Sequence, residues 1–129
     1  MVNFTVAIPT YNSENHLHLI LDALIAQTGL SDISWEVIVA DNNSSDNTAS
    51  IVSQYQTKWP TNTHLRYLFE PKQGAGFARN QAVKAANSEL VGFLDDDVLP
   101  APDWIASAYQ FGTEHPNIGL SSGQIHGNF

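Results

Sequence analysis

The sequence predicts an α/β protein with a mostly parallel sheet flanked by helices. Short apolar, β-branched segments alternate with segments whose apolar residues recur at helical spacing, in the order β-α-β-α-β-α-β. Strands joined through helices in this way run parallel, and the helices cover both faces of the sheet. The chain has 129 residues, which fits one domain with a single core.

The first strand and the first helix follow from the residue pattern. Residues 4–8 are apolar or β-branched, and Pro9 is expected to close this strand. Gly29 is expected to end the helix that follows, because glycine is favoured just after a helical C-terminus. The apolar stripe of this helix consists of Leu17, Ile20, Leu21, Leu24 and Ile25.

The second strand is predicted over residues 35–40, which are almost all apolar. The polar run 41–46 follows it and is rich in residues that begin helices. Apolar positions between residues 51 and 59 mark the second helix, which Pro60 is expected to stop.

The third strand is predicted over residues 64–69, and a glycine-containing loop over residues 71–76 follows it. An alanine-rich helix is expected through residues 78–86. Residues 89–94 then form a short apolar run, which predicts the fourth strand.

Two weaker signals follow the fourth strand. A short helix is expected around Trp104, and residues 118–120 are expected to begin a fifth strand. Residues 123–129 resemble sequence from the middle of a domain, so we expect the domain to be truncated.

Composition narrows the class of protein. The net charge is -8 and the pI is about 4.7, which argues against a nucleic-acid-binding surface. The absence of cysteine excludes disulfides and thiolate metal sites. No apolar stretch approaches the roughly 20 residues of a membrane span. Strand-like sequence begins directly after Met1, so we predict no signal peptide and expect a soluble, cytoplasmic protein.

Three consecutive carboxylates, Asp95, Asp96 and Asp97, follow the fourth predicted strand. They repel one another, and a hard divalent cation bound by oxygen atoms would relieve the repulsion. In this hypothesis Asp97 is a direct metal ligand, Asp95 contacts a ribose hydroxyl or the ion through water, and Asp96 supports either. The alternative is a solvated acidic turn that caps the next helix.

Polar segments follow all four predicted strands, and the carboxyl ends of parallel strands meet at one edge of a sheet. We therefore predict a shared phosphate-binding pocket with a bridging metal. It draws on residues 9–12, the run that begins at Asp41, the loop around Gly74 and the aspartate triplet.

Several single residues of these segments have two interpretations. Tyr11 either stacks on a base or packs at the edge of the core. Asp41 either accepts a hydrogen bond from a base or ribose, or caps a helix. Glu14 lies in a first helical turn, where the helix dipole favours an acid in any case. Gly74 allows close approach of the backbone to a ligand, and Arg79 either lies at the pocket or forms a structural ion pair.

These segments, in this order, resemble the nucleotide-sugar-binding half of the family-2 glycosyltransferases, which have the Rossmann-like GT-A fold. The resemblance implies transfer of a sugar from a nucleoside diphosphate with the help of Mn²⁺ or Mg²⁺. The Asp-x-Asp motif of the family matches Asp95 and Asp97. The matching pieces are residues 6–12 (VAIPTYN), 37–46 (VIVADNNSSD), 74–80 (GAGFARN) and 93–97 (FLDDD).

The same resemblance implies a donor site for a nucleoside-diphosphate sugar, most commonly a UDP-sugar in this family. Pro9, Thr10, Tyr11 and Asp41 would line its base and ribose pocket, and Arg79 would lie near it. The parent enzyme would transfer the sugar with inversion to an acceptor hydroxyl, in polysaccharide or glycoconjugate synthesis.

The family places the acceptor site and the general base later in the domain, and no residue here matches that base. We therefore expect residues 1–129 to be the N-terminal donor-binding part of one glycosyltransferase domain, without the acceptor-binding part and inactive in isolation. Association with the inner face of a membrane would come only from parts outside this chain. The oligomeric state stays open.

Three other classes of protein make different demands on the sequence. A receiver-type signalling domain needs an acidic pair after its first strand and a lysine after its fifth, but Pro9 and Thr10 follow the first strand here and no lysine follows Lys84. A nucleotidyltransferase needs a basic, glycine-rich loop after the first strand, which is missing. A non-catalytic module that binds nucleotide and metal stays the alternative.

Overall fold

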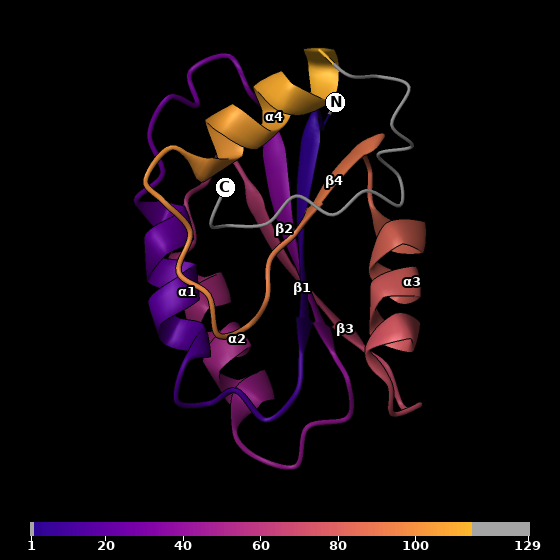
Figure 1. The fold of residues 1–129 in the computed structure, drawn as a ribbon. Helices are drawn as coiled ribbons and strands as arrows, with labels where there is room; N and C mark the ends of the chain where they lie inside the picture. Colours follow the sequence, from indigo (N-terminus) through magenta and orange to yellow (C-terminus); the bar gives the residue numbers. More distant parts are fainter. Residues whose placement is uncertain (1, 115–129) are drawn as a thin grey trace.

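The computed structural model describes residues 2–114, which form a parallel four-stranded sheet between two layers of helices (Figure 1). The strand order is β3-β2-β1-β4. The predicted α/β class with a parallel sheet is confirmed, whereas the predicted fifth strand at 118–120 lies outside the described residues. The elements are β1 (Phe4–Thr10), α1 (Leu17–Ile25), β2 (Trp35–Asp41), α2 (Thr48–Lys58), β3 (His64–Phe69), α3 (Ala75–Ala85), β4 (Leu90–Phe93) and α4 (Trp104–Glu114).

The register of the strands brings three of their carboxyl ends to the same level. Thr10 of β1 pairs with Asp41 of β2, and Asp41 pairs with Phe69 of β3. In contrast, β4 pairs with β1 only as far as Ala7, and the Leu94 N–H then donates to the Ala7 carbonyl at 2.9 Å. Because β4 ends early, the acidic loop after it starts beside the last residues of β1.

The sequence pattern predicted that Pro9 closes β1. This prediction is wrong, because the strand continues to Thr10. The backbone of Pro9 points to the same side as that of Ala7, which is the side of β4. Since β4 has already ended at this level, the missing N–H of Pro9 costs the sheet no hydrogen bond.

The two faces of the sheet carry different helices (Figure 1). Helix α3 covers one face with Ala78 and Ala82, which pack near Ala7, Ile38 and Ala40. The other helices cover the opposite face, where the larger core lies. In that core the rings of Phe4 and Trp104 meet edge to face, with centroids 6.1 Å apart.

Helix boundaries differ from the predictions at three places. Helix α1 ends at Ile25, before Gly29, which lies in the following loop with φ +76°. The reason is tertiary: the Thr28 N–H donates to the Pro102 carbonyl at 2.8 Å, and the Gln27 amide donates to the Ala101 carbonyl at 2.7 Å.

The other two differences are in length. Helix α3 begins at Ala75, inside the predicted 71–76 loop, and α4 is 11 residues long, where a short helix had been expected. Within residues 2–114, none of these helices is long and apolar enough to cross a membrane.

Candidate functional site

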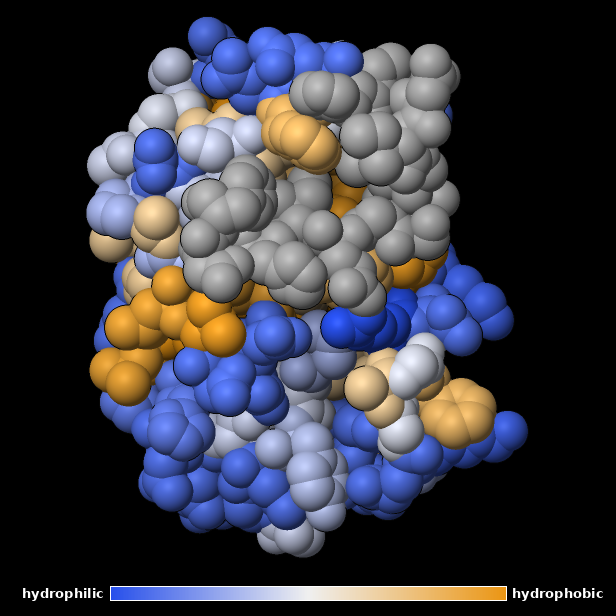
Figure 2. All heavy atoms as spheres, in the orientation of Figure 1, coloured by the Kyte–Doolittle hydropathy of each residue, from blue (hydrophilic) through white to orange (hydrophobic). Residues whose placement is uncertain are grey.

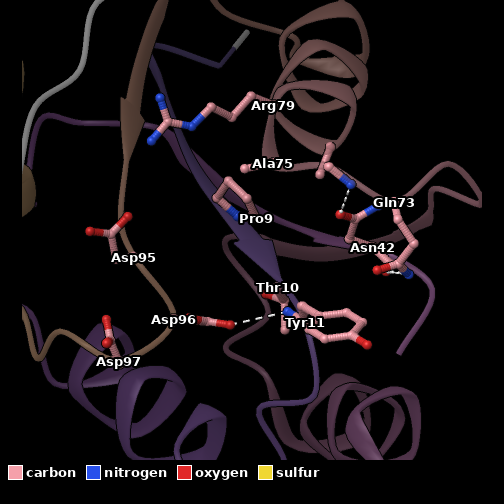
Figure 3. A pocket seen from close by; sticks show the side chains of 12 residues that line it. Pro9, Thr10, Tyr11, Asn42, Gln73, Ala75, Arg79, Asp95, Asp96 and Asp97 are labelled. Carbon is pink, nitrogen blue, oxygen red and sulfur yellow. Dashed lines mark hydrogen bonds between the residues drawn. The ribbon is translucent and has the colours of Figure 1, made fainter. Parts of the chain in front are cut away.

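A cavity of about 500 Å³ opens where the carboxyl ends of the strands meet, beside the beginning of α3 (Figure 3). This end of the molecule, at the bottom of Figure 2, has a largely hydrophilic surface. Among the predicted site residues, Asp41 and Glu14 do not line the cavity. The lining residues are Pro9, Thr10, Tyr11, Asn42, Gln73, Gly74, Ala75, Ala78, Arg79, Asp95, Asp96 and Asp97.

The three aspartates of the triplet have different surroundings. Asp96 accepts a hydrogen bond from the Tyr11 N–H at 3.1 Å and another from the Ser13 hydroxyl, so it ties the loop after β4 to the loop after β1. Asp95 and Asp97 are exposed, and their carboxylates accept no hydrogen bond from any side chain or amide of residues 2–114. Figure 3 shows them on the side of the loop away from Tyr11, with Asp96 pointing toward Tyr11.

This arrangement fits a divalent cation that the protein holds only in part. No group of three or more acidic or histidine side chains within residues 2–114 converges closely enough to hold a metal alone. Asp95 and Asp97 nevertheless offer carboxylate oxygens that no described residue occupies, and such oxygens are hard ligands. Mg²⁺ and similar ions are commonly bound by one or two carboxylates together with substrate phosphates and water.

Thr10 and Tyr11 differ in how far they reach into the cavity. The Thr10 hydroxyl donates to the Ile8 carbonyl at 2.9 Å, and the residue is only 1% exposed. Tyr11 is 51% exposed, which is incompatible with packing in the core. Tyr11 therefore lines the cavity as a largely exposed aromatic side chain (Figure 3).

Arg79 reaches from α3 to the side of the cavity where Asp95 lies (Figure 3). Its guanidinium lies over the ring of Phe93, 5.2 Å from the centroid. Within residues 2–114 it makes no ion pair, since the pair found there joins Arg66 and Glu36, and its buried Nε lacks a hydrogen-bond partner. The structural ion pair that is the alternative role for Arg79 is therefore absent from the described part of the chain.

Asp41 is 2% exposed and is the last residue of β2. One carboxylate oxygen accepts the Ser44 N–H at 3.0 Å, and the other accepts the Tyr67 hydroxyl at 2.6 Å. Burial and the adjacent Asp41 carboxylate raise the pKa of Tyr67 well above its usual range. Asp41 thus shapes the loop beside the cavity through these two contacts.

Glu14 lies in the connection between β1 and α1 and not in the first turn of the helix, as had been predicted, because α1 begins at Leu17. Its contacts lead to the loop after β2. Its N–H donates to Asp46 at 3.2 Å, and its carboxylate accepts the Asn47 side-chain amide at 3.3 Å. Nearby, the Asn12 N–H donates to the Ser44 hydroxyl at 2.9 Å. These bonds join the two loops to each other.

The sequence-based prediction included Asn42, Gln73 and Ala75 only as parts of the predicted segments and named none of them as a lining residue, and it did not name Ala78 as one. Asn42 could have been found, because it directly follows Asp41 at the end of β2 and side chains alternate between the faces of a strand. The alanines carry no chemical signal, so only the docking of α3 against the sheet reveals them.

Comparison with known proteins gives matches over most of the chain. A family model described as Glycosyl transferase family 2 matches residues 5–127. The poly(ribitol-phosphate) beta-N-acetylglucosaminyltransferase TarS of Staphylococcus aureus (strain Mu50 / ATCC 700699) is 36% identical over 115 residues, which are 89% of this chain and 20% of TarS. The uncharacterized glycosyltransferase YfnE of Bacillus subtilis (strain 168) is 36% identical over 114 residues, covering 88% of this chain and 28% of YfnE.

Solved structures give the same picture. The structure of S. aureus TarS 1-349 in complex with UDP has a TM-score of 0.75 and 33% identity, covering 89% of this chain and 33% of that one. The mannosyltransferase PcManGT from Pyrobaculum calidifontis, in complex with GDP-Man and Mn²⁺, has a TM-score of 0.77 and 33% identity, covering 85% of this chain and 32% of that one. The chain therefore spans about a third or less of these relatives.

Proposed function

The chain belongs to glycosyl transferase family 2, and on that premise we propose that its cavity binds the nucleoside-diphosphate sugar from which a sugar is transferred to an acceptor hydroxyl. One observation carries the proposal. Asp95 and Asp97 line the same cavity as the exposed Tyr11 and Arg79, and no residue within 2–114 donates a hydrogen bond to their carboxylates. A diphosphate, a base and a divalent cation together match these groups.

Each group has a proposed part in holding the donor. Asp97 binds the cation directly, and Asp95 contacts the ribose or the cation. Tyr11 stacks on the base through its exposed ring. Arg79 faces the phosphates as a permanently charged donor of hydrogen bonds. Asp96 joins two walls of the pocket, and Asp41 and Glu14 act through the loops that they hold.

A bound Mn²⁺ or Mg²⁺ would neutralise negative charge on the leaving diphosphate. The chain itself has a net charge of -8, and three aspartates border the cavity. A diphosphate is repelled by these charges at close range unless a cation lies between them. The complexes of related structures with UDP, GDP-Man and Mn²⁺ support this donor chemistry.

The transfer step itself requires a base that deprotonates the acceptor hydroxyl as it attacks the anomeric carbon with inversion. We propose that this base and the acceptor site belong to parts of the domain outside residues 1–129. The relatives above are three or more times longer than the matched region, which supports the proposal. The acceptor would belong to a polysaccharide or another glycoconjugate.

The proposal is tested by calorimetry on the wild-type chain with UDP or GDP, each with Mn²⁺ or with a chelator. We expect binding of at least one nucleotide that depends on Mn²⁺ and is lost in Asp97→Asn. Asp32→Asn is the matched control, because it removes the same charge at an exposed position outside the cavity. Absence of metal-dependent binding in the wild type would contradict the proposal.

A further inference from the structure

We infer that Asn42 is a positioning residue of the donor site, because its side-chain amide holds the loop over residues 70–74 and thereby places the first turn of α3 beside the cavity. The inference rests on the proposed function, since it concerns the same cavity. Asn42 is 6% exposed and borders that cavity at the end of β2.

The amide of Asn42 makes three contacts with the backbone of the 70–74 loop. Its Nδ2 donates to the Lys72 carbonyl at 2.6 Å and lies 3.4 Å from the Glu70 carbonyl. Its Oδ1 accepts the Gly74 N–H at 2.9 Å. One side chain thus satisfies a carbonyl and an N–H that lie two residues apart on the same loop.

The backbone of Asn42 completes the connection between the two sides of the cavity. Its N–H donates to the Thr10 carbonyl at 2.8 Å, which joins it to the end of β1. Its carbonyl accepts the Gln73 side-chain amide at 2.7 Å. The end of β1 and the beginning of α3 are therefore linked through this one residue.

Gly74 directly precedes α3. Gly74 is the N-cap residue of α3, has φ +137° and makes no side-chain cap hydrogen bond. Its N–H bond to Asn42 is the contact that ties this first turn to β2. Ala75, Ala78 and Arg79 follow within the helix and line the cavity, so a shift of Gly74 moves that wall.

Only a side chain with a donor and an acceptor in this geometry meets both demands. An ionised aspartate has the same shape as asparagine and can accept the Gly74 N–H. Its second oxygen would face the Lys72 carbonyl, however, and two acceptors at 2.6 Å repel each other. The substitution Asn42→Asp therefore replaces the hydrogen bond to the Lys72 carbonyl by a repulsion between two oxygen atoms.

Asn43 supplies a matched control in the same loop. It is exposed, and its amide lies 3.4 Å from the Pro71 carbonyl, so it contributes little to holding residues 70–74. Its φ of +61° is one that glycine adopts readily, so Asn43→Gly leaves the backbone path in place. Asn42→Asp thus disturbs the hydrogen bonds that hold residues 70–74, whereas Asn43→Gly leaves them in place.

The test measures the affinity of the wild type, Asn42→Asp and Asn43→Gly for UDP and GDP in the presence of Mn²⁺, by calorimetry. We expect Asn42→Asp to bind about tenfold or more weakly, in line with a lost and reversed hydrogen bond, and Asn43→Gly to remain within about threefold of the wild type. The Gly74 amide resonance should shift in Asn42→Asp and stay in place in Asn43→Gly. Binding of Mn²⁺ alone should be retained in all three proteins, because Asp95 and Asp97 are unchanged.

The outcomes separate this inference from the proposed function. Equal nucleotide affinity of a folded Asn42→Asp and the wild type would overturn the positioning role and leave the donor site in place. A wild type that binds neither nucleotide would overturn both. If Asn42→Asp does not fold, Asn42→Ser provides the same comparison without a buried charge, and it should also weaken nucleotide binding by about tenfold.

Discussion

Adjacent residues at the ends of the strands have different roles at the site, because successive side chains of a strand point to opposite faces. Asp41 points toward Tyr67, which packs against the larger core, and Asn42 borders the cavity beside α3. In the loop after β4 a similar division sets Asp96, which holds two loops together, apart from Asp95 and Asp97. Charge alone would have assigned all of these carboxylates to the ligand.

The hydrogen bond from Tyr67 to Asp41 should be measurable as stability. We expect Tyr67→Phe to lower the free energy of unfolding by about 1 kcal/mol near neutral pH, because the ring stays and the hydroxyl is lost. The folded-state pKa of Tyr67 is raised, so this contribution is fully present below the unfolded pKa of about 10 and declines as pH rises above it.

Urea unfolding of both proteins between pH 7 and 11 checks this prediction. The difference in the free energy of unfolding between the wild type and Tyr67→Phe should be constant up to about pH 9. It should then narrow, because the unfolded tyrosine has a pKa near 10. Tyr11→Phe is the control, because Tyr11 is 51% exposed and its hydroxyl has no partner among residues 2–114. A difference in the free energy of unfolding that widens at high pH would contradict a stabilising hydrogen bond from Tyr67 to Asp41.

At the scale of elements, long-range polar contacts decide where helices and strands attach. The carboxylate of Glu36, 1% exposed on β2, accepts the Thr5 hydroxyl at 2.8 Å, the Asn87 N–H at 2.8 Å and the Arg66 guanidinium at 3.1 Å. Burial raises the pKa of Glu36, but the bonds from Asn87, Thr5 and Arg66 outweigh it and hold the pKa below its usual range. This cluster anchors the connection from α3 to β4 at the end of the sheet opposite the cavity.

The packing of α4 on the sheet depends on a glycine in β4. A Cβ at Gly92 would lie 2.6 Å from the Phe4 ring and 3.2 Å from the Trp104 ring. We expect Gly92→Ala to destabilise the protein by about 1–3 kcal/mol, because both rings belong to the core and must move.

Thermal unfolding of Gly92→Ala and Gly76→Ala checks this prediction. A Cβ at Gly76, in the first turn of α3, would meet no atom within 4 Å. Alanine should therefore raise stability there by up to about 1 kcal/mol through its higher helix propensity. If Gly92→Ala unfolds at the same temperature as the wild type, a Cβ at this position does not disturb the packing of Phe4 and Trp104, and the prediction is wrong.

At the scale of the whole molecule, the negative net charge is expected to make binding of a nucleotide depend on binding of a metal ion. The chain carries 13 acidic and 5 basic residues, and the cavity adds local negative charge from the triplet. The anionic nucleotide should therefore bind weakly without a cation. Mn²⁺ at the triplet would convert the same surface into a site for diphosphate.

A thermal shift assay measures this coupling. At a ligand concentration of 100 Kd, UDP or GDP with Mn²⁺ should stabilise the fold by about 2.7 kcal/mol, which corresponds to a rise in Tm of roughly 10 °C for a domain of this size. Nucleotide with a chelator should give little shift, and Asp97→Asn should remove the effect of Mn²⁺. An equal shift with and without metal would refute the role of the cation.

The order of the strands and helices was determined by the sequence alone, because each depends on a local pattern: short apolar, β-branched runs in the strands and the stripe from Leu17 to Ile25 in α1. The gathering of Tyr11, Gly74, Arg79 and the triplet at one edge also followed, since a parallel sheet brings its carboxyl ends together.

The tertiary structure decided which of these side chains face the cavity and where the elements end. Asp41 and Asp96 are held by Tyr67 and by Tyr11, partners 26 and 85 residues away in the chain. The end of α1 is set by contacts with the loop before α4. Such hydrogen bonds join distant segments and leave no periodic trace in the sequence, so only the folded chain separates Asn42, which holds the wall of the cavity, from Asp41 beside it.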